Sequence, residues 1–183
     1  MEMFNNEYFE LLNKMIGKKG SRDDDEYKKL KEGEELTKKW ATAVCSNVFP
    51  DGDFDNKNKP TNQANNYKGY TWARLYPNKN SNKSLAYTIG VDHKFGFVVK
   101  IDTVNASKRL RHAYEAERGE FSTSKIVKIK SIDEGINSGF DGLVSWAVDA
   151  INSLTSFYDY LIKKLPLDTA KPDQDESDAP GHL

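Results

Sequence analysis

The middle of the chain combines aromatic side chains with lysines and arginines. Lysine and arginine contact phosphates, whereas aromatic rings stack on unpaired or extruded bases, so together they supply the chemistry of nucleic-acid binding. A basic start to a short predicted helix adds three further cations after this stretch. We therefore expect the nucleic-acid-binding residues to be Tyr67, Lys68, Tyr70, Trp72, Arg74, Lys79, Lys83, Lys108, Arg109 and Arg111.

The distribution of charge supports this expectation. The 183 residues carry a net charge of -1, but residues 57–130 contain 15 basic and 5 acidic residues, which leaves +10. The segment before them has 9 basic and 13 acidic residues (-4), and the segment after them has 3 and 10 (-7). A locally basic surface attracts polyanions even when the whole molecule is nearly neutral. A second explanation stays open, in which the central positive charge only balances the acidic ends.

Trp72 has two interpretations. In a strand, Tyr70, Trp72, Arg74 and Tyr76 have the same parity and therefore share one face of the sheet. If that face is accessible, the Trp72 ring is available to stack on a base. If the last helix covers it, Trp72 is a core residue.

Metal binding has little support in the sequence. Asp51, Asp53 and Asp55 match the first carboxylates of a calcium loop, but Asn56 stands where the loop needs glycine and Asn62 where it needs glutamate. The histidines are far apart, and a single cysteine cannot form a zinc cluster. We therefore expect no metal ion and no cofactor. The histidines meant here are His93, His112 and His182, and the cysteine is Cys45.

Catalysis is not expected from this chain. A metal-dependent nuclease would need a carboxylate two residues before a lysine, in addition to acids such as Asp92 or Asp102. Val98 precedes Lys100 at that spacing, and no acyl-, phosphoryl- or hydride-transfer motif is present. We therefore expect no catalytic residue.

Hydrophobic periodicity predicts the elements that position these residues. Helices are expected at residues 6–16, 23–48 and 107–118, and a long one at 140–165 with one broad apolar face. β-Branched and aromatic residues predict strands at 70–76, 85–92, 95–104 and 124–132, with a two-residue hairpin at 93–94 and an exposed loop at 49–66.

These elements predict an α+β fold. N-terminal helices precede a small, mostly antiparallel sheet of about four strands, on which the long C-terminal amphipathic helix packs. We expect one domain over residues 1–166 and a disordered tail, or a linker to a missing domain, over 167–183. No stretch reaches the roughly 20 apolar residues of a membrane span and no secretory signal begins the chain, so we expect a cytoplasmic protein without a membrane partner.

The order of elements resembles the N-terminal DNA-recognition domain of McrB-type modification-dependent restriction enzymes. The likeness covers roughly residues 60–162 and rests on three features, namely Tyr-Lys-Gly-Tyr-Thr-Trp at 67–72, the strand pair over 85–102 and the closing helix over 140–160. In that family the domain binds DNA carrying a methylated cytosine and flips the base into an aromatic-lined pocket. A GTP-driven motor domain and a partner nuclease then cut the DNA.

The resemblance implies a role in a bacterial restriction or antiviral defence system. It implies DNA as the partner, a downstream motor domain, a nuclease subunit, and a base pocket formed by Trp72, Leu85 and Ile89. Arg74 places a charge where the family's strand is more uniformly apolar, so another modified base, or none, stays open. An alternative function is that of a protein-interaction adaptor, in which the acidic tail or the long helix docks a partner.

Overall fold

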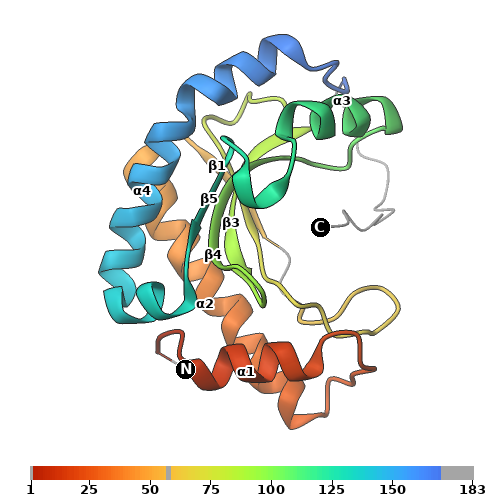
Figure 1. Cartoon of the computed structure of the whole chain (residues 1–183), viewed down its shortest axis with the longest axis vertical. Coiled ribbons are helices and arrows are strands. Elements are labelled where there is room, and N and C mark those ends of the chain that lie inside the picture. The colour runs from red at the N-terminus through yellow and green to blue at the C-terminus, as the bar shows by residue number, and fades with distance from the viewer. Residues whose placement is uncertain (1, 57–58, 170–183) are drawn as a thin grey trace.

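A five-stranded antiparallel sheet forms the centre of the described chain (Figure 1). In the computed structural model, which describes residues 2–56 and 59–169, the strands follow one another in the sheet in chain order. They are β1 (Asp53–Asn56), β2 (Ala73–Tyr76), β3 (Leu85–Asp92), β4 (Gly96–Thr103) and β5 (Val127–Lys130). The α+β class is confirmed, with five strands rather than about four.

Helices α1 (Asn6–Met15), α2 (Asp25–Val48) and α4 (Ile132–Lys164) accompany the sheet. Figure 1 shows α2 and α4 along one face and α1 at the end of the molecule opposite α3 (Lys108–Arg118). Trp40 of α2 packs edge-on against Phe97 of β4, and Tyr158 of α4 stacks on Tyr87 of β3 with ring centroids 4.5 Å apart. The long C-terminal helix therefore packs on the sheet as predicted, because its apolar stripe matches the alternating apolar residues of β3 and β4.

Strand β1 lies where the sequence predicts an exposed loop. Its residues have low strand propensity, and pairing with β2 holds them in place. Phe54 packs against the core, and the carboxylates of Asp53 and Asp55 reach cations of Lys83 and Arg74. Tertiary contacts thus override local propensity here.

Helix α4 begins at Ile132, eight residues before the apolar stripe that predicts it. Ser131 and Glu134 form a capping box, in which each side chain accepts a hydrogen bond from the other residue's backbone N–H. Gly139 then adopts a φ of 67°, which kinks the helix. Conversely, β2 and β5 are shorter than predicted, and Tyr70 makes only an isolated bridge to Asp92.

The β3–β4 hairpin has a three-residue loop, not the two-residue loop predicted. Asp92 pairs with Gly96, and its Oδ1 accepts hydrogen bonds from the backbone N–H groups of Lys94 and Phe95. Gly96 supplies the positive φ (85°) that closes the turn. His93 is half-buried, with Nδ1 3.2 Å from the Gly69 carbonyl oxygen.

The start of the predicted tail is attached to the domain. Leu167 packs against the core and Asp168 hydrogen-bonds to Ser107, whereas residues 170–183, including His182, lie outside the described residues. None of the helices described has both the length and the apolar character needed to cross a bilayer.

Candidate nucleic-acid interface

Tyr67 and Lys68 belong to the interior. Tyr67 is 2% exposed and its hydroxyl donates to Asp24 Oδ2 at 3.2 Å. The Lys68 ammonium lies 2.9 Å from Glu34 Oε1, with side chains 9% and 2% exposed. Burial raises the pKa of Glu34 to about 7, although Lys68 acts in the opposite direction. These residues fasten the segment before β2 onto α2, and neither is available to a phosphate.

The sheet face turned away from α2 and α4 carries Trp72, the residue predicted to stack on a base. We call this the far face and define it by Trp72, Arg74, Tyr76, Thr88 and Lys100. The Arg74 guanidinium lies 3.9 Å from the centroid of the Trp72 ring, and the Lys83 ammonium lies 4.0 Å from that of Tyr76. The prediction that Tyr70, Trp72, Arg74 and Tyr76 share one face is confirmed for the last three. Tyr70 lies before β2, is half-buried, and has the Lys68 ammonium 5.6 Å from its ring centroid.

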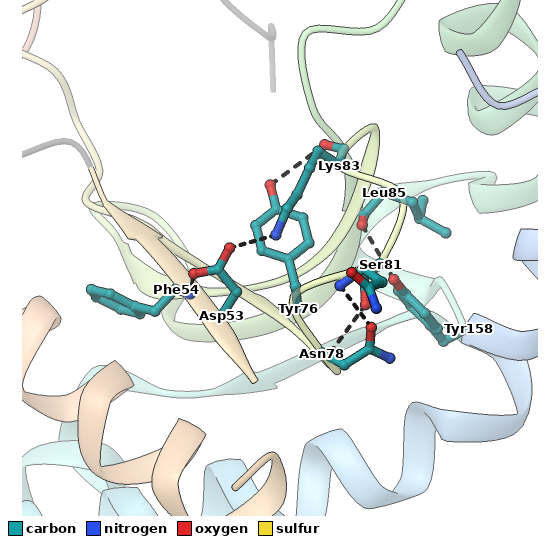
Figure 2. Close-up of polar contacts among 9 residues, drawn as sticks. Asp53, Phe54, Tyr76, Asn78, Ser81, Lys83, Leu85 and Tyr158 are labelled. Carbon is teal, nitrogen blue, oxygen red and sulfur yellow. Dashed lines mark hydrogen bonds and ion pairs between the residues drawn. The ribbon is translucent and has the colours of Figure 1, made fainter. Parts of the chain in front are cut away.

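Carboxylates of β1 neutralise two cations of this region. Arg74 Nη1 lies 3.4 Å from Asp55 Oδ2, and Lys83 Nζ lies 2.5 Å from Asp53 Oδ2, as Figure 2 shows beside the Tyr76 ring. The hydrogen bond from Lys83 holds the pKa of Asp53 below its usual value. A phosphate must compete with these two carboxylates to reach either cation.

The residues predicted for a base pocket are divided between the two faces of the sheet. Ala73 pairs with Ile89 on the side of the helices, so Trp72, one residue earlier, belongs to the far face. Leu85 and Ile89 are both 0% exposed within the core. Trp72 is half-buried, and α4 packs on the opposite face through the stacking of Tyr158 on Tyr87. The three side chains therefore do not line a common pocket.

The segments that carry the other predicted cations meet at the end of the molecule that holds α3. Ser84, at the end of the β2–β3 loop, accepts a backbone hydrogen bond from Val104, and Asn82 donates to the Asp168 carbonyl at 3.2 Å. Asp168 also binds Ser107, the residue before α3. These bonds bring two segments of the chain together. We call the cations carried by these segments the basic end and define it by Lys79, Lys83, Lys108, Arg109 and Arg111.

A carboxylate already occupies the start of α3. Asp168 Oδ2 accepts from the Ser107 backbone N–H at 2.8 Å, and Asp168 Oδ1 accepts from the Ser107 hydroxyl at 2.7 Å. The first turn of α3 contains no acidic residue, whereas Lys108, Arg109 and Arg111 are all basic. The N-terminal end of a helix dipole is positive, so positive side chains there destabilise the helix. Helix stability therefore does not explain their presence.

Sequence reasoning missed several basic residues. Lys100 lies across Thr88 from Arg74 on the far face, where its ammonium is 2.6 Å from Asp102 Oδ2. Lys128 and Lys130 belong to β5 at the sheet edge. Alternating lysines over 128–130 are visible in the sequence, but the register that places Lys100 on the same face as Arg74 is not.

The acids that a nuclease would require lie apart. Asp92 pairs opposite Gly96 at the hairpin turn, whereas Asp102 pairs opposite Ala86 at the other end of the same two strands. Among the residues that the structure describes, no group of three histidine, cysteine or acidic side chains is placed to hold a metal ion.

Comparison of the chain with protein-family models, curated proteins and solved structures gives no match. The resemblance to the McrB-type recognition domain therefore stays a prediction.

Proposed function

We propose that this chain is a DNA-binding recognition module that acts by binding and holds the DNA backbone at the basic end. The observation that supports the proposal is that two separate segments rich in basic residues are joined at the start of α3. Lys79, Lys108 and Arg109 are exposed there, and Arg111 is half-buried. The resemblance adds the proposals of a bacterial restriction or defence role and of a modified base as the feature recognised.

The position of Asp168 indicates which chemistry this surface favours. Its carboxylate is bound by one backbone N–H and one hydroxyl, beside a helix terminus surrounded by cations. A phosphate oxygen accepts the same hydrogen bonds and gains from the same positive field. Trp72, on the far face just before β2, supplies an aromatic ring that is partly accessible.

Salt dependence of binding tests the proposal. We expect the observed association constant for a short DNA duplex to fall linearly with salt on a logarithmic plot. The slope should be about -0.9 for each phosphate contacted, and about -0.7 for a single strand. A fluorescence-anisotropy titration at several salt concentrations measures it. A slope near zero would overturn the proposal.

A charge-reversed variant separates loss of binding from loss of fold. The double substitution Lys108→Glu and Arg109→Glu should weaken DNA binding at least tenfold, yet leave α3 intact or slightly more stable, because acidic residues favour a helix N-terminus. The double substitution Lys29→Glu and Lys38→Glu, at two exposed positions of α2, makes the same change in net charge and should bind as the unaltered protein does. Equal affinities for the two variants would place the binding surface elsewhere.

Trp72 tests the recognition of a base. If its ring stacks on an extruded base, Trp72→Ala should reduce selectivity for methylated over plain DNA by about 1–3 kcal/mol. Competition between the two duplexes measures this difference, and circular dichroism checks the fold. Unchanged selectivity in a folded variant would remove base stacking by Trp72 and leave backbone binding in place.

A further inference from the structure

Strand β5 has a free edge in the described structure. The sheet ends at this strand, whose other side pairs with β4. The Ile101 N–H donates to the Ile126 carbonyl, which makes these facing residues a hydrogen-bonded pair. Such pairs alternate along an antiparallel ladder, so the backbone groups of Lys128 point toward β4 and those of Val127 and Ile129 point outward. In agreement with this alternation, the Val127 N–H donates to the Ser124 carbonyl and not to β4.

A groove of about 470 Å³ lies beside this edge, between β5 and α4. Trp146, Asp149 and Ser153 line it from α4, and Val127, Lys128 and Ile129 line it from β5. The Trp146 ring stacks on the buried Trp40 ring, with centroids 6.3 Å apart and planes 20° apart. The apolar wall of the groove is therefore fixed before any ligand arrives, which lowers the entropic cost of binding.

The two sides of the β5 edge differ in chemistry. Lys128 and Lys130 face the side of α4, where the Lys130 ammonium lies 5.7 Å from the Trp146 ring centroid. Ile129 faces the opposite side and is 37% exposed. In the described structure Lys128 forms no ion pair, and Asp149 is the acidic residue of the groove. In a strand added at this edge, alternate side chains would lie beside the positive charge on the side of α4. The remaining side chains would lie beside the apolar surface on the opposite side.

We propose that the edge of β5 binds an extended segment of a partner protein by strand addition, and that this segment alternates acidic with apolar residues. Lysines at a sheet edge discourage pairing with ordinary strands, because an incoming strand must bury their charge. An acidic segment compensates that charge, so the same lysines select for it. The outward N–H and C=O of Ile129 supply the main-chain bonds, and the groove accommodates side chains on the side of Trp146.

A pair of synthetic peptides tests this site. A labelled peptide that alternates valine and glutamate should bind the whole chain, and one that alternates valine and lysine should bind at least tenfold more weakly. Nuclear magnetic resonance should place the shifted signals at residues 127–130 and at the Trp146 indole. Equal binding of the two peptides, or shifts confined to α3, would overturn the proposal.

Ile129→Pro is the decisive variant. Proline removes an outward N–H but no hydrogen bond to β4, so the sheet should keep its pairing while the peptide affinity falls at least tenfold. Ile129→Val retains the N–H and should bind as before. Should the proline variant unfold, Lys128→Glu tests the same site through its charge and should also lower the affinity at least tenfold.

The occupant is tested separately. Concentration-dependent dimerisation that Ile129→Pro abolishes would show that a second copy occupies the edge, and would overturn the choice of an acidic partner. Displacement of the peptide by DNA would overturn it as well. The Lys108→Glu and Arg109→Glu variant should retain peptide binding, so failure of this proposal and failure of DNA binding at the basic end are distinguishable.

Discussion

At the scale of single residues, the buried pair of Glu34 and Lys68 joins α2 to the segment that precedes β2. The Thr37 and Thr71 hydroxyls, 2.6 Å apart, form a second link between the same two parts. Removing one partner of a buried ion pair leaves an uncompensated charge in the interior. The pair therefore fixes the start of β2 and, through it, the position of Trp72.

The raised pKa of Glu34 predicts a pH dependence of stability. Because the folded-state pKa is about 7 and the ordinary value is 4.5, the unfolded state ionises first as the pH rises. The contribution of Glu34 to the free energy of unfolding should therefore be fully present below about pH 4.5 and fall by roughly 3 kcal/mol as the pH rises through 7. Glu34→Gln should lack this fall. Urea unfolding over this pH range measures it.

A control isolates the effect of Glu34 from that of other carboxylates. Glu10→Gln alters an exposed acid of α1, and its pH profile should match that of the unaltered protein. Parallel profiles for Glu34→Gln and the unaltered protein would contradict the assignment.

The sequence predicts which residues of one strand share a face, because alternation within the strand determines this. It does not predict which residues meet across the fold, because those contacts join distant parts of the chain. Alternation correctly placed Trp72, Arg74 and Tyr76 on one face. It could not show that Leu85 and Ile89 face the other way, because parity relates residues within a strand and the register between strands is set by packing. Nor could it show that Lys68 pairs with Glu34 across the fold.

At the scale of elements, α3 combines two opposing features. Three basic residues occupy its first turn, which the helix dipole disfavours, and a distant carboxylate compensates them. The sequence predicts the helix and its end at Gly119, because periodicity and a C-terminal glycine are local signals. The partner at its start lies 61 positions away, and local signals do not reveal it.

Asp168→Ala should shift the balance at this terminus. Loss of the carboxylate frees the Ser107 N–H and hydroxyl for a phosphate, so we expect DNA affinity to rise several-fold. The same change removes a hydrogen-bonded anion from the helix start and should cost about 0.5–2 kcal/mol of stability. DNA titration and thermal unfolding measure the two effects. Weaker binding by a folded Asp168→Ala protein would show that the carboxylate does not compete with DNA.

At the scale of the whole molecule, folding cancels part of the positive charge that the linear count assigns to the middle of the chain. Lys68, Arg74, Lys83 and Lys100 each form an ion pair with a carboxylate. Three of these carboxylates come from outside the basic segment 57–130, namely Glu34, Asp53 and Asp55. The α+β class could be predicted because it depends on local periodicity, whereas the shape of the positive surface could not, because it depends on which carboxylates fold against which cations.

Removing one of these carboxylates should enlarge the positive surface. In Asp53→Asn the Lys83 ammonium loses its ion pair and can contact a phosphate at the basic end. We expect tighter DNA binding and a salt slope steeper by up to about 0.9, the contribution of one added phosphate contact. Asp141→Asn makes the same change in net charge on an exposed position of α4 and should leave the slope unchanged. The salt slope counts phosphate contacts, so it should change only when the unpaired cation lies where DNA binds. If the two variants changed the slope equally, net charge and not the arrangement of the basic end would govern binding.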